Sequence, residues 1–264
     1  MIPQVVYPDK QLSQNTKKLY KFFMQGCGAK KAVRASDILS GKVELADTVF
    51  VRGVLKGTGK IINQANNFWY MDHPYIGRYQ GFNRICYNSY ICGLPEADYP
   101  SDRFDELKTK LSDWRTSGDH IILCPPSLRV QKQCGIYTGS NDGWARNVIE
   151  TIAQYTDRPI FVSTKYGDGL TNFKKEKPKH RFVDLIKNAW VTVAFNSNTV
   201  IDSLVHGVPV ISLSPERVIG SLRDIENPIM DRSILNYIAY NQWNCKQIAS
   251  GQAWAELTTR YNIC

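Results

Sequence analysis

The most constraining feature of the sequence is a regular alternation of apolar and helical segments across residues 116–215. Short runs rich in Val and Ile, which are typical of buried strands, occur at 120–124, 159–162, 190–194 and 209–212. Segments with the apolar spacing of helices separate them, at 144–155, 182–188 and 199–206. Strands that alternate with helices at short intervals indicate βαβ units, so this region predicts a doubly wound parallel sheet covered on both faces.

The rest of the chain is less regular. Residues 1–115 predict a second α/β region, with strands at 2–8, 47–51 and 68–71 and helices at 15–25 and 105–114. We therefore expect an α/β fold of two Rossmann-like domains facing each other, at 1–115 and 116–230, followed by a helical tail at 231–264. Two such domains would hold a ligand between them, outside the carboxyl ends of the strands.

Charge gives the first indication of a partner. The chain has 33 Lys and Arg residues against 24 Asp and Glu, a net charge of +9. Residues 1–60 contain eleven basic and four acidic residues, so 11 − 4 = +7 of that excess lies there. A basic region of this kind favours a polyanionic partner such as nucleic acid. The alternative is a basic surface that only keeps the protein soluble.

Several classes of protein are excluded. No run of eighteen apolar residues occurs, so we expect no membrane span, and the first residues lack the pattern of a secretory signal. The seven cysteines are odd in number and form no C-x-x-C pair, which argues against a disulfide framework or a zinc ribbon. We therefore expect a cytoplasmic protein.

A strand that runs directly into a helix is the most informative segment. The expected strand 190–194 is followed by Asn196 and Ser197, where the helix begins, and Gly207 ends that helix before Val-Pro-Val-Ile. Ser197 or Asn198 would cap the helix and leave backbone N–H groups facing an anion, as at many phosphate sites. A capped helix with a purely structural role is the alternative.

This segment resembles the C-terminal half of GT-B glycosyltransferases, in which two Rossmann-like domains bind a nucleotide-sugar at their interface. The chain also looks like a group of bacteriophage and bacterial glycosyltransferases. The matching stretches cover most of residues 68–254, at 68–77, 99–103, 120–127, 156–160, 191–211 and 238–254. The resemblance implies that 1–115 binds the acceptor and that 116–230 binds the nucleotide-sugar.

The resemblance also implies the residues that bind the donor, a UDP-sugar. The diphosphate cradle would consist of Asn196, Ser197, Asn198 and Thr199, with Lys165 neutralising the leaving group. Asp202 would contact the ribose, unless it faces the core, and Ser127 would contact donor phosphate or acceptor. The sequence has no D-x-D doublet and no paired-glutamate motif. We therefore expect inversion, no essential metal and no tightly bound cofactor.

Glycosyl transfer needs a base that deprotonates the acceptor hydroxyl. Asp72 and His73 directly follow the expected strand 68–71, in the half that would hold the acceptor. We expect Asp72 to be the base, and His73 is the second candidate. The structural alternatives are a turn cap for Asp72 and a turn position for His73.

Charge and resemblance together suggest double-stranded phage DNA as the acceptor, with glucose or arabinose added to 5-hydroxymethylcytosine. Trp69, Tyr75 and Tyr79 would then hold a flipped base, and Arg78 and Arg84 would grip the strand. Core-packing aromatic residues and solvated arginines are the structural alternatives.

Two other functions remain open. One is a glycosyltransferase acting on a surface glycan or a lipid-linked acceptor, whose basic region would meet anionic head groups. The other is a DNA-binding module without catalysis.

Overall fold

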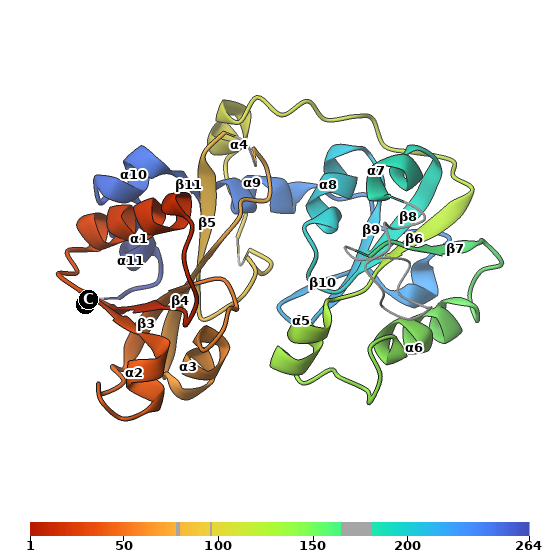
Figure 1. Ribbon diagram of the computed structural model, residues 1–264. Helices are drawn as coiled ribbons and strands as arrows, with labels where there is room; N and C mark the ends of the chain where they lie inside the picture. The colour runs from red at the N-terminus through yellow and green to blue at the C-terminus, as the bar shows by residue number, and fades with distance from the viewer. Residues whose placement is uncertain (78–79, 96, 165–180, 264) are drawn as a thin grey trace. The chain divides into compact units, whose positions relative to one another are not determined.

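The computed structural model describes residues 1–77, 80–95, 97–164 and 181–263. The chain forms two compact units (Figure 1). Unit 1 comprises Met1–Cys92 together with Ile238–Cys264, and unit 2 comprises Gly93–Tyr237. Each unit contains helices and one sheet of mostly parallel strands, which confirms the expected fold class of two Rossmann-like domains.

Unit 1 is built on a six-stranded sheet in the order β11-β5-β4-β3-β1-β2. Strands β1 to β4 pair in parallel, whereas β5 is antiparallel to both β4 and β11. The strands are β1 (Gln4–Tyr7), β2 (Ala32–Arg34), β3 (Thr48–Arg52), β4 (Asn67–Asp72), β5 (Phe82–Tyr87) and β11 (Gln242–Asn244). The helices are α1 (Gln14–Cys27), α2 (Ala35–Leu39), α3 (Thr58–Gln64), α10 (Cys245–Ala249) and α11 (Gln252–Arg260).

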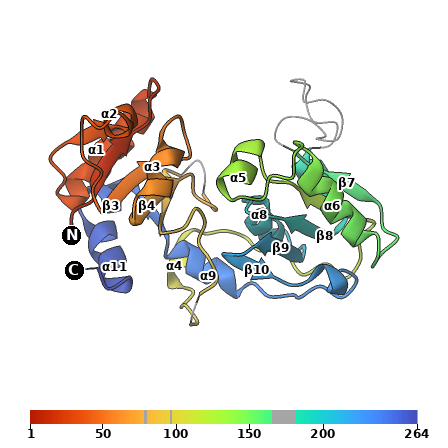
Figure 2. The same ribbon diagram turned by 90° about the horizontal axis from the view of Figure 1, so that it is seen from below.

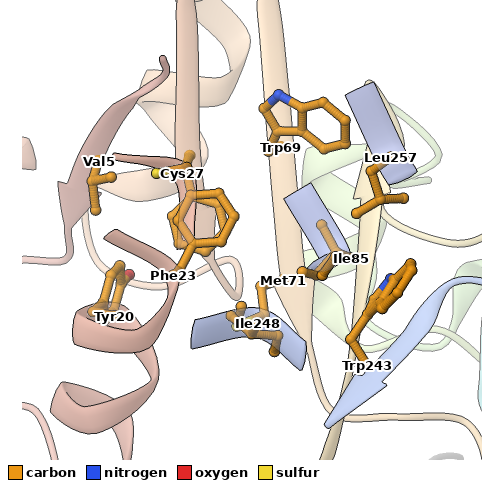
Figure 3. Close-up of a cluster of buried hydrophobic side chains, with 12 residues drawn as sticks. Val5, Tyr20, Phe23, Cys27, Trp69, Met71, Ile85, Trp243, Ile248 and Leu257 are labelled. Carbon is orange, nitrogen blue, oxygen red and sulfur yellow. The ribbon is translucent and has the colours of Figure 1, made fainter. Parts of the chain in front are cut away.

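Successive side chains along a strand point to opposite faces of a sheet, so the strands of unit 1 contribute to two hydrophobic cores. Val6, Val51 and Tyr70 pack on one face with residues of α2 and α3. The opposite face packs against α1, α10 and α11. Figure 3 shows this second cluster, in which sheet residues meet residues of the C-terminal segment, among them Trp69, Met71, Ile85, Trp243, Ile248 and Leu257.

The C-terminal segment is an integral part of unit 1. Strand β11 extends its sheet, α10 packs on α1, and both chain ends lie at the same side of the unit (Figure 2). Gly26 permits the close helix contact, because a Cβ there would lie 1.9 Å from the carbonyl oxygen of Ile248. The C-terminal residues are mostly helical, as expected, but from Ile238 onward they belong to unit 1 and do not form a separate tail.

Unit 2 contains a five-stranded sheet in the order β10-β9-β8-β6-β7, with only β10 antiparallel to its neighbour. The strands are β6 (His120–Cys124), β7 (Ile160–Val162), β8 (Ala189–Ala194), β9 (Val210–Ser214) and β10 (Arg217–Ile219). The helices are α4 (Asp102–Glu106), α5 (Leu128–Gln133), α6 (Gly143–Ile152), α7 (Phe182–Leu185) and α8 (Thr199–Val205), with short 3-10 helices η1 (Ile186–Asn188) and η2 (Leu222–Asp224). Helix α9 (Ser233–Ala239) leads back to unit 1.

The order of strands in unit 2 creates a topological switch point. After β6 the chain adds β7 on one side, and it then returns to add β8 on the other side of β6. The carboxyl ends of β6 and β8 therefore lie next to each other, and the segments that follow them lead away to opposite sides. Ligands of open α/β sheets bind in the crevice at such points.

Two expectations about boundaries differ from the structure. The chain divides after Cys92 rather than after residue 115, and again after Tyr237 rather than at 230. The expected helix 105–114 is also wrong beyond α4. Lys108 has a positive φ of 50°, and the chain then runs beside α8 and β9, where the Arg115 N–H donates to the Gly207 carbonyl at 2.8 Å.

None of the helices within the described part of the chain is long and apolar enough to cross a bilayer.

Candidate functional site

Asp72 lies at the carboxyl end of β4 in unit 1, where three donors hold its carboxylate. The Tyr70 hydroxyl donates to Oδ2 at 2.9 Å, and the His73 backbone N–H donates to Oδ1 at 2.8 Å. The Arg84 guanidinium lies 3.5 Å from Oδ2, because β4 and β5 pair with Asp72 opposite Arg84. The Asp72 side chain is 28% exposed.

The charge on Asp72 is fixed by these contacts. Burial by itself raises the pKa of this carboxyl, but Arg84, the His73 N–H and the Tyr70 hydroxyl together lower the pKa below its ordinary value. Burial and the neighbouring Asp72 raise the pKa of Tyr70, so its hydroxyl stays a donor. Asp72 is therefore ionised at neutral pH, as a general base must be. The His73 N–H contact is also the turn cap of the structural alternative.

A glutamine from the C-terminal segment holds the loop that follows Asp72. Gln242 on β11 accepts hydrogen bonds at Oε1 from the backbone N–H groups of Tyr75, at 2.5 Å, and of Ile76, at 2.9 Å. Its Nε2 donates to the Ile76 carbonyl at 3.3 Å. Gln242 is buried, whereas His73 at the start of the same loop is exposed. The C-terminal segment thus fixes the position of the loop that follows Asp72 and begins with His73.

The structure places three expected acceptor-binding residues in the interior of unit 1. Trp69 is fully buried among aromatic residues, with its ring 5.1 Å from that of Trp254, so it has no free face for a base. Tyr75 is buried and its hydroxyl accepts from the Cys92 N–H at 2.8 Å. Arg84 is buried over the Tyr75 ring and pairs with Asp72. These placements correct the expected contacts with DNA, in favour of the core-packing alternative for the two aromatic residues.

The remaining two expected acceptor residues, Arg78 and Tyr79, lie outside the described residues. So does Lys165, the residue expected to neutralise the leaving group.

The other expected donor residues follow the two strands that flank the switch point of unit 2. Ser127 comes after β6, and its Oγ accepts from the Val130 N–H at 3.4 Å at the start of α5. Asn196–Thr199 come after β8 and are half-buried. Because β6 and β8 are adjacent and parallel, these two segments lie at the same edge of the sheet.

The backbone N–H groups at the start of α8 have hydrogen-bond partners within the same segment. Asn198 is the N-cap residue of α8, and no side chain forms a capping hydrogen bond there. The Ser197 Oγ, one residue earlier, accepts from the Thr199 N–H at 3.2 Å. The N–H groups of Val200 and Ile201 donate to the carbonyls of Ser197 and Asn198 at 3.3 Å and 3.0 Å. The expected anion site made of first-turn N–H groups therefore does not form, which leaves the side chains of Asn196–Thr199 as the donor-binding candidates.

Buried hydroxyl groups attach α8 to β8. The Ser203 Oγ lies 2.8 Å from the Thr192 Oγ1 and 2.7 Å from the Thr199 carbonyl oxygen. Next to them, burial raises the pKa of the Cys124 thiol to about 12, so this cysteine is protonated and inert as a nucleophile. Asp202 on the same helix is exposed, so the core-facing alternative for this residue is wrong.

A pocket of about 810 Å³ opens at the same edge of unit 2, beside the carboxyl ends of β6 and β7. Ser127 lines it, whereas Asn196–Thr199 do not. Sequence reasoning singled out only Ser127 among the lining residues, because most of the others come from segments that carry no motif. Within the described ranges, no group of three or more His, Cys, Asp or Glu residues is placed to hold a metal ion.

Comparisons with known proteins bear on the fold. No protein-family model and no curated protein matches the sequence. Among solved structures, the β-Kdo 2,4 transferase of KpsC from Thermosulfurimonas dismutans is similar, with a TM-score of 0.51 and 11% identity over 90% of each chain. The β-Kdo 2,7 transferase of the same KpsC has a TM-score of 0.43 and 15% identity, over 84% of this chain and 88% of that one. The two-unit α/β architecture is thus a fold found in a glycosyltransferase.

Proposed function

We propose that this protein is a glycosyltransferase that transfers a sugar from a nucleotide-sugar to a glycan acceptor. The observation that carries the proposal is the fold similarity to a Kdo transferase, which extends over 90% of both chains. The placement of the candidate residues supports it. Asp72 is an ionised, partly exposed carboxylate at a strand end in unit 1, and the donor candidates lie at the switch point of unit 2.

The chemistry is a displacement at the anomeric carbon of the donor sugar. In our proposal Asp72 accepts the proton of the acceptor hydroxyl, whose oxygen forms the new bond to that carbon. The bond from this carbon to the phosphate oxygen breaks, and the nucleotide leaves with the electron pair. Direct attack of this kind inverts the configuration. Ser127 and Asn196–Thr199 are the candidates for contacts with the donor in unit 2.

A glycan acceptor is favoured over DNA for two reasons. A solved structure that is similar to this chain is a Kdo transferase, and three residues expected to contact DNA are buried in unit 1. The basic N-terminal region agrees with an acidic glycan as well as with DNA, since both are polyanions. Between Lys10 and Arg34 the sequence contains basic residues and no Asp or Glu.

Mass spectrometry of the products tests the proposal. The protein is incubated with a panel of nucleotide-sugars, including nucleotide-activated Kdo and UDP-sugars, and with acidic oligosaccharides or 5-hydroxymethylcytosine DNA. We expect a mass gain on an oligosaccharide that Asp72→Asn abolishes. A gain on DNA alone would move the acceptor to DNA. Neither transfer nor donor hydrolysis with any pair would refute the glycosyltransferase function and leave a binding module.

A further inference from the structure

The pocket of unit 2 contains a buried side-chain oxygen with an unused hydrogen-bonding capacity. Gln131 on α5 lines the pocket and is 1% exposed. Its Nε2 donates to the carbonyl oxygens of Pro126 and Asn141, both at 3.0 Å, which fixes the orientation of the amide. Its Oε1 is buried and has no hydrogen-bond partner among the described residues. Such an acceptor is costly unless a ligand donates to it.

The walls of the pocket combine apolar and polar side chains, and this combination suits a nucleobase. Five of the thirteen lining residues are apolar, namely Pro125, Pro126, Leu128, Ala145 and Val162, and apolar atoms form the larger part of the lining. A nucleobase has two apolar faces, and it carries N–H donors only at its edge. The volume of about 810 Å³ lies within the range of small-molecule sites.

The rim of the pocket is cationic. Arg129 and Lys132 both line it and are exposed. One carboxylate, that of Asp142, also lines the pocket, but Arg146 binds it at 2.6 Å. A negatively charged group at the rim would therefore meet two cations, which suits the phosphate of a nucleotide.

We infer that this pocket binds the nucleotide part of the donor, with the base inside and its N–H donating to Gln131 Oε1. The phosphate lies at the rim near Arg129 and Lys132. The buried Thr164 hydroxyl, which also has no hydrogen-bond partner among the described residues, offers a second contact to the edge of the base. This inference rests on the proposed function for the identity of the ligand, and it assigns base recognition to residues that carry no sequence motif.

Calorimetric titration of the full chain with nucleotides tests the pocket. The probes are UMP, CMP, AMP and GMP, with ribose 5-phosphate as the ligand that lacks a base. We expect at least one nucleotide to bind ten times more tightly than ribose 5-phosphate. The analogue of that nucleotide in which methyl groups replace the N–H hydrogens of the base should lose about tenfold in affinity. In that analogue the Gln131 oxygen would again be left without a donor.

Modifying the ligand is preferable to replacing Gln131, because Gln131→Met would also remove the two hydrogen bonds that hold the loop. The protein variants therefore address the rim. The double variant Arg129→Ala with Lys132→Ala should weaken nucleotide binding at least tenfold. Lys187→Ala is the matched control, since this exposed lysine on η1 precedes β8 and lies at the opposite edge of the sheet. It should bind like the wild type.

The outcomes separate the pocket from the proposed function. Nucleotides that bind no better than ribose 5-phosphate, or a double variant that binds like the wild type, would overturn the assignment of this pocket as the nucleotide site. If sugar transfer still occurs in that case, the glycosyltransferase function stands and the donor binds elsewhere. Nucleotide binding with the expected pattern, but without transfer or hydrolysis, would overturn the function and keep the pocket.

Discussion

The side chain of Gln242 accepts a hydrogen bond from the backbone N–H of Tyr75, 167 positions earlier in the chain. The same oxygen also accepts from the N–H of Ile76, and both donors are buried. One glutamine of the C-terminal segment therefore satisfies two backbone groups of the loop that begins at Asp72.

Replacing this glutamine should destabilise unit 1. Gln242→Met keeps the volume of the side chain but leaves both N–H groups without an acceptor, so we expect a loss of about 2–4 kcal/mol in the free energy of unfolding. Urea unfolding followed by tryptophan fluorescence measures it. Gln25→Met, at an exposed position of α1, is the matched control and should change stability by less than about 0.5 kcal/mol. Equal effects of the two variants would contradict the role of Gln242.

Asp72→Asn tests the proposed base. The amide cannot accept the proton of the acceptor hydroxyl, so we expect the rate of transfer to fall by about 10² to 10⁴. Donor binding should stay within a few fold, because the donor candidates lie in unit 2. Product formation and donor titration with the same preparation measure the two quantities. If donor binding collapses as well, Asp72 has a structural role.

Stability in acid depends on the same carboxylate. The pKa of Asp72 is lowered in the folded protein, so its stabilising contribution is present above the ordinary carboxyl pKa of about 3.9. The contribution is lost as the pH falls through the lower pKa of the folded state. We expect wild type and Asp72→Asn to differ in unfolding free energy at pH 7 and to converge in acid. Asp98→Asn, an exposed position, should follow the wild type throughout. A pH-independent difference for Asp72→Asn would contradict this linkage.

The contact between Ser203 and Thr192 should be measurable as a coupling. Ser203→Ala removes a buried hydroxyl that faces both the Thr192 hydroxyl and the Thr199 carbonyl, and we expect a loss of about 1–3 kcal/mol. A double-mutant cycle with Thr192→Val isolates the pair, and its coupling energy should be at least about 0.5 kcal/mol. Additive effects would show that the two hydroxyl groups do not hold α8 on β8.

The sequence predicts unit 2 well because its strands are buried on both faces and read as continuous apolar runs. The expected strand 120–124 coincides with β6, and the expected helix 199–206 differs from α8 by one residue. The helix expected at 15–25 from its apolar spacing is also present, as α1. The structure shows that Ser13 caps this helix and that Gly28 ends it in a left-handed conformation.

The parts that were missed depend on contacts between distant segments. Strand β11 has three residues, two of them polar, and its pairing with β5 is invisible in a local pattern. In the sequence, nothing distinguishes Arg84 from a surface arginine. Only the register of β4 and β5 places it opposite Asp72. The helix expected at 105–114 has the correct apolar spacing, but backbone contacts with the end of α8 and the turn into β9 hold that segment in a non-helical path.

The return of the chain from unit 2 to unit 1 has a consequence for biosynthesis. Domains generally fold as units while the chain emerges from the ribosome. The first 92 residues emerge early, but their core needs Trp243, Ile248 and Leu257, which follow the whole of unit 2. While unit 2 folds, the side chain of Trp69 in nascent unit 1 therefore lacks the rings of Trp254 and Tyr261 that later pack against it. The interval before the last strand arrives is when a chaperone that holds exposed apolar surface would matter most to the yield of this protein.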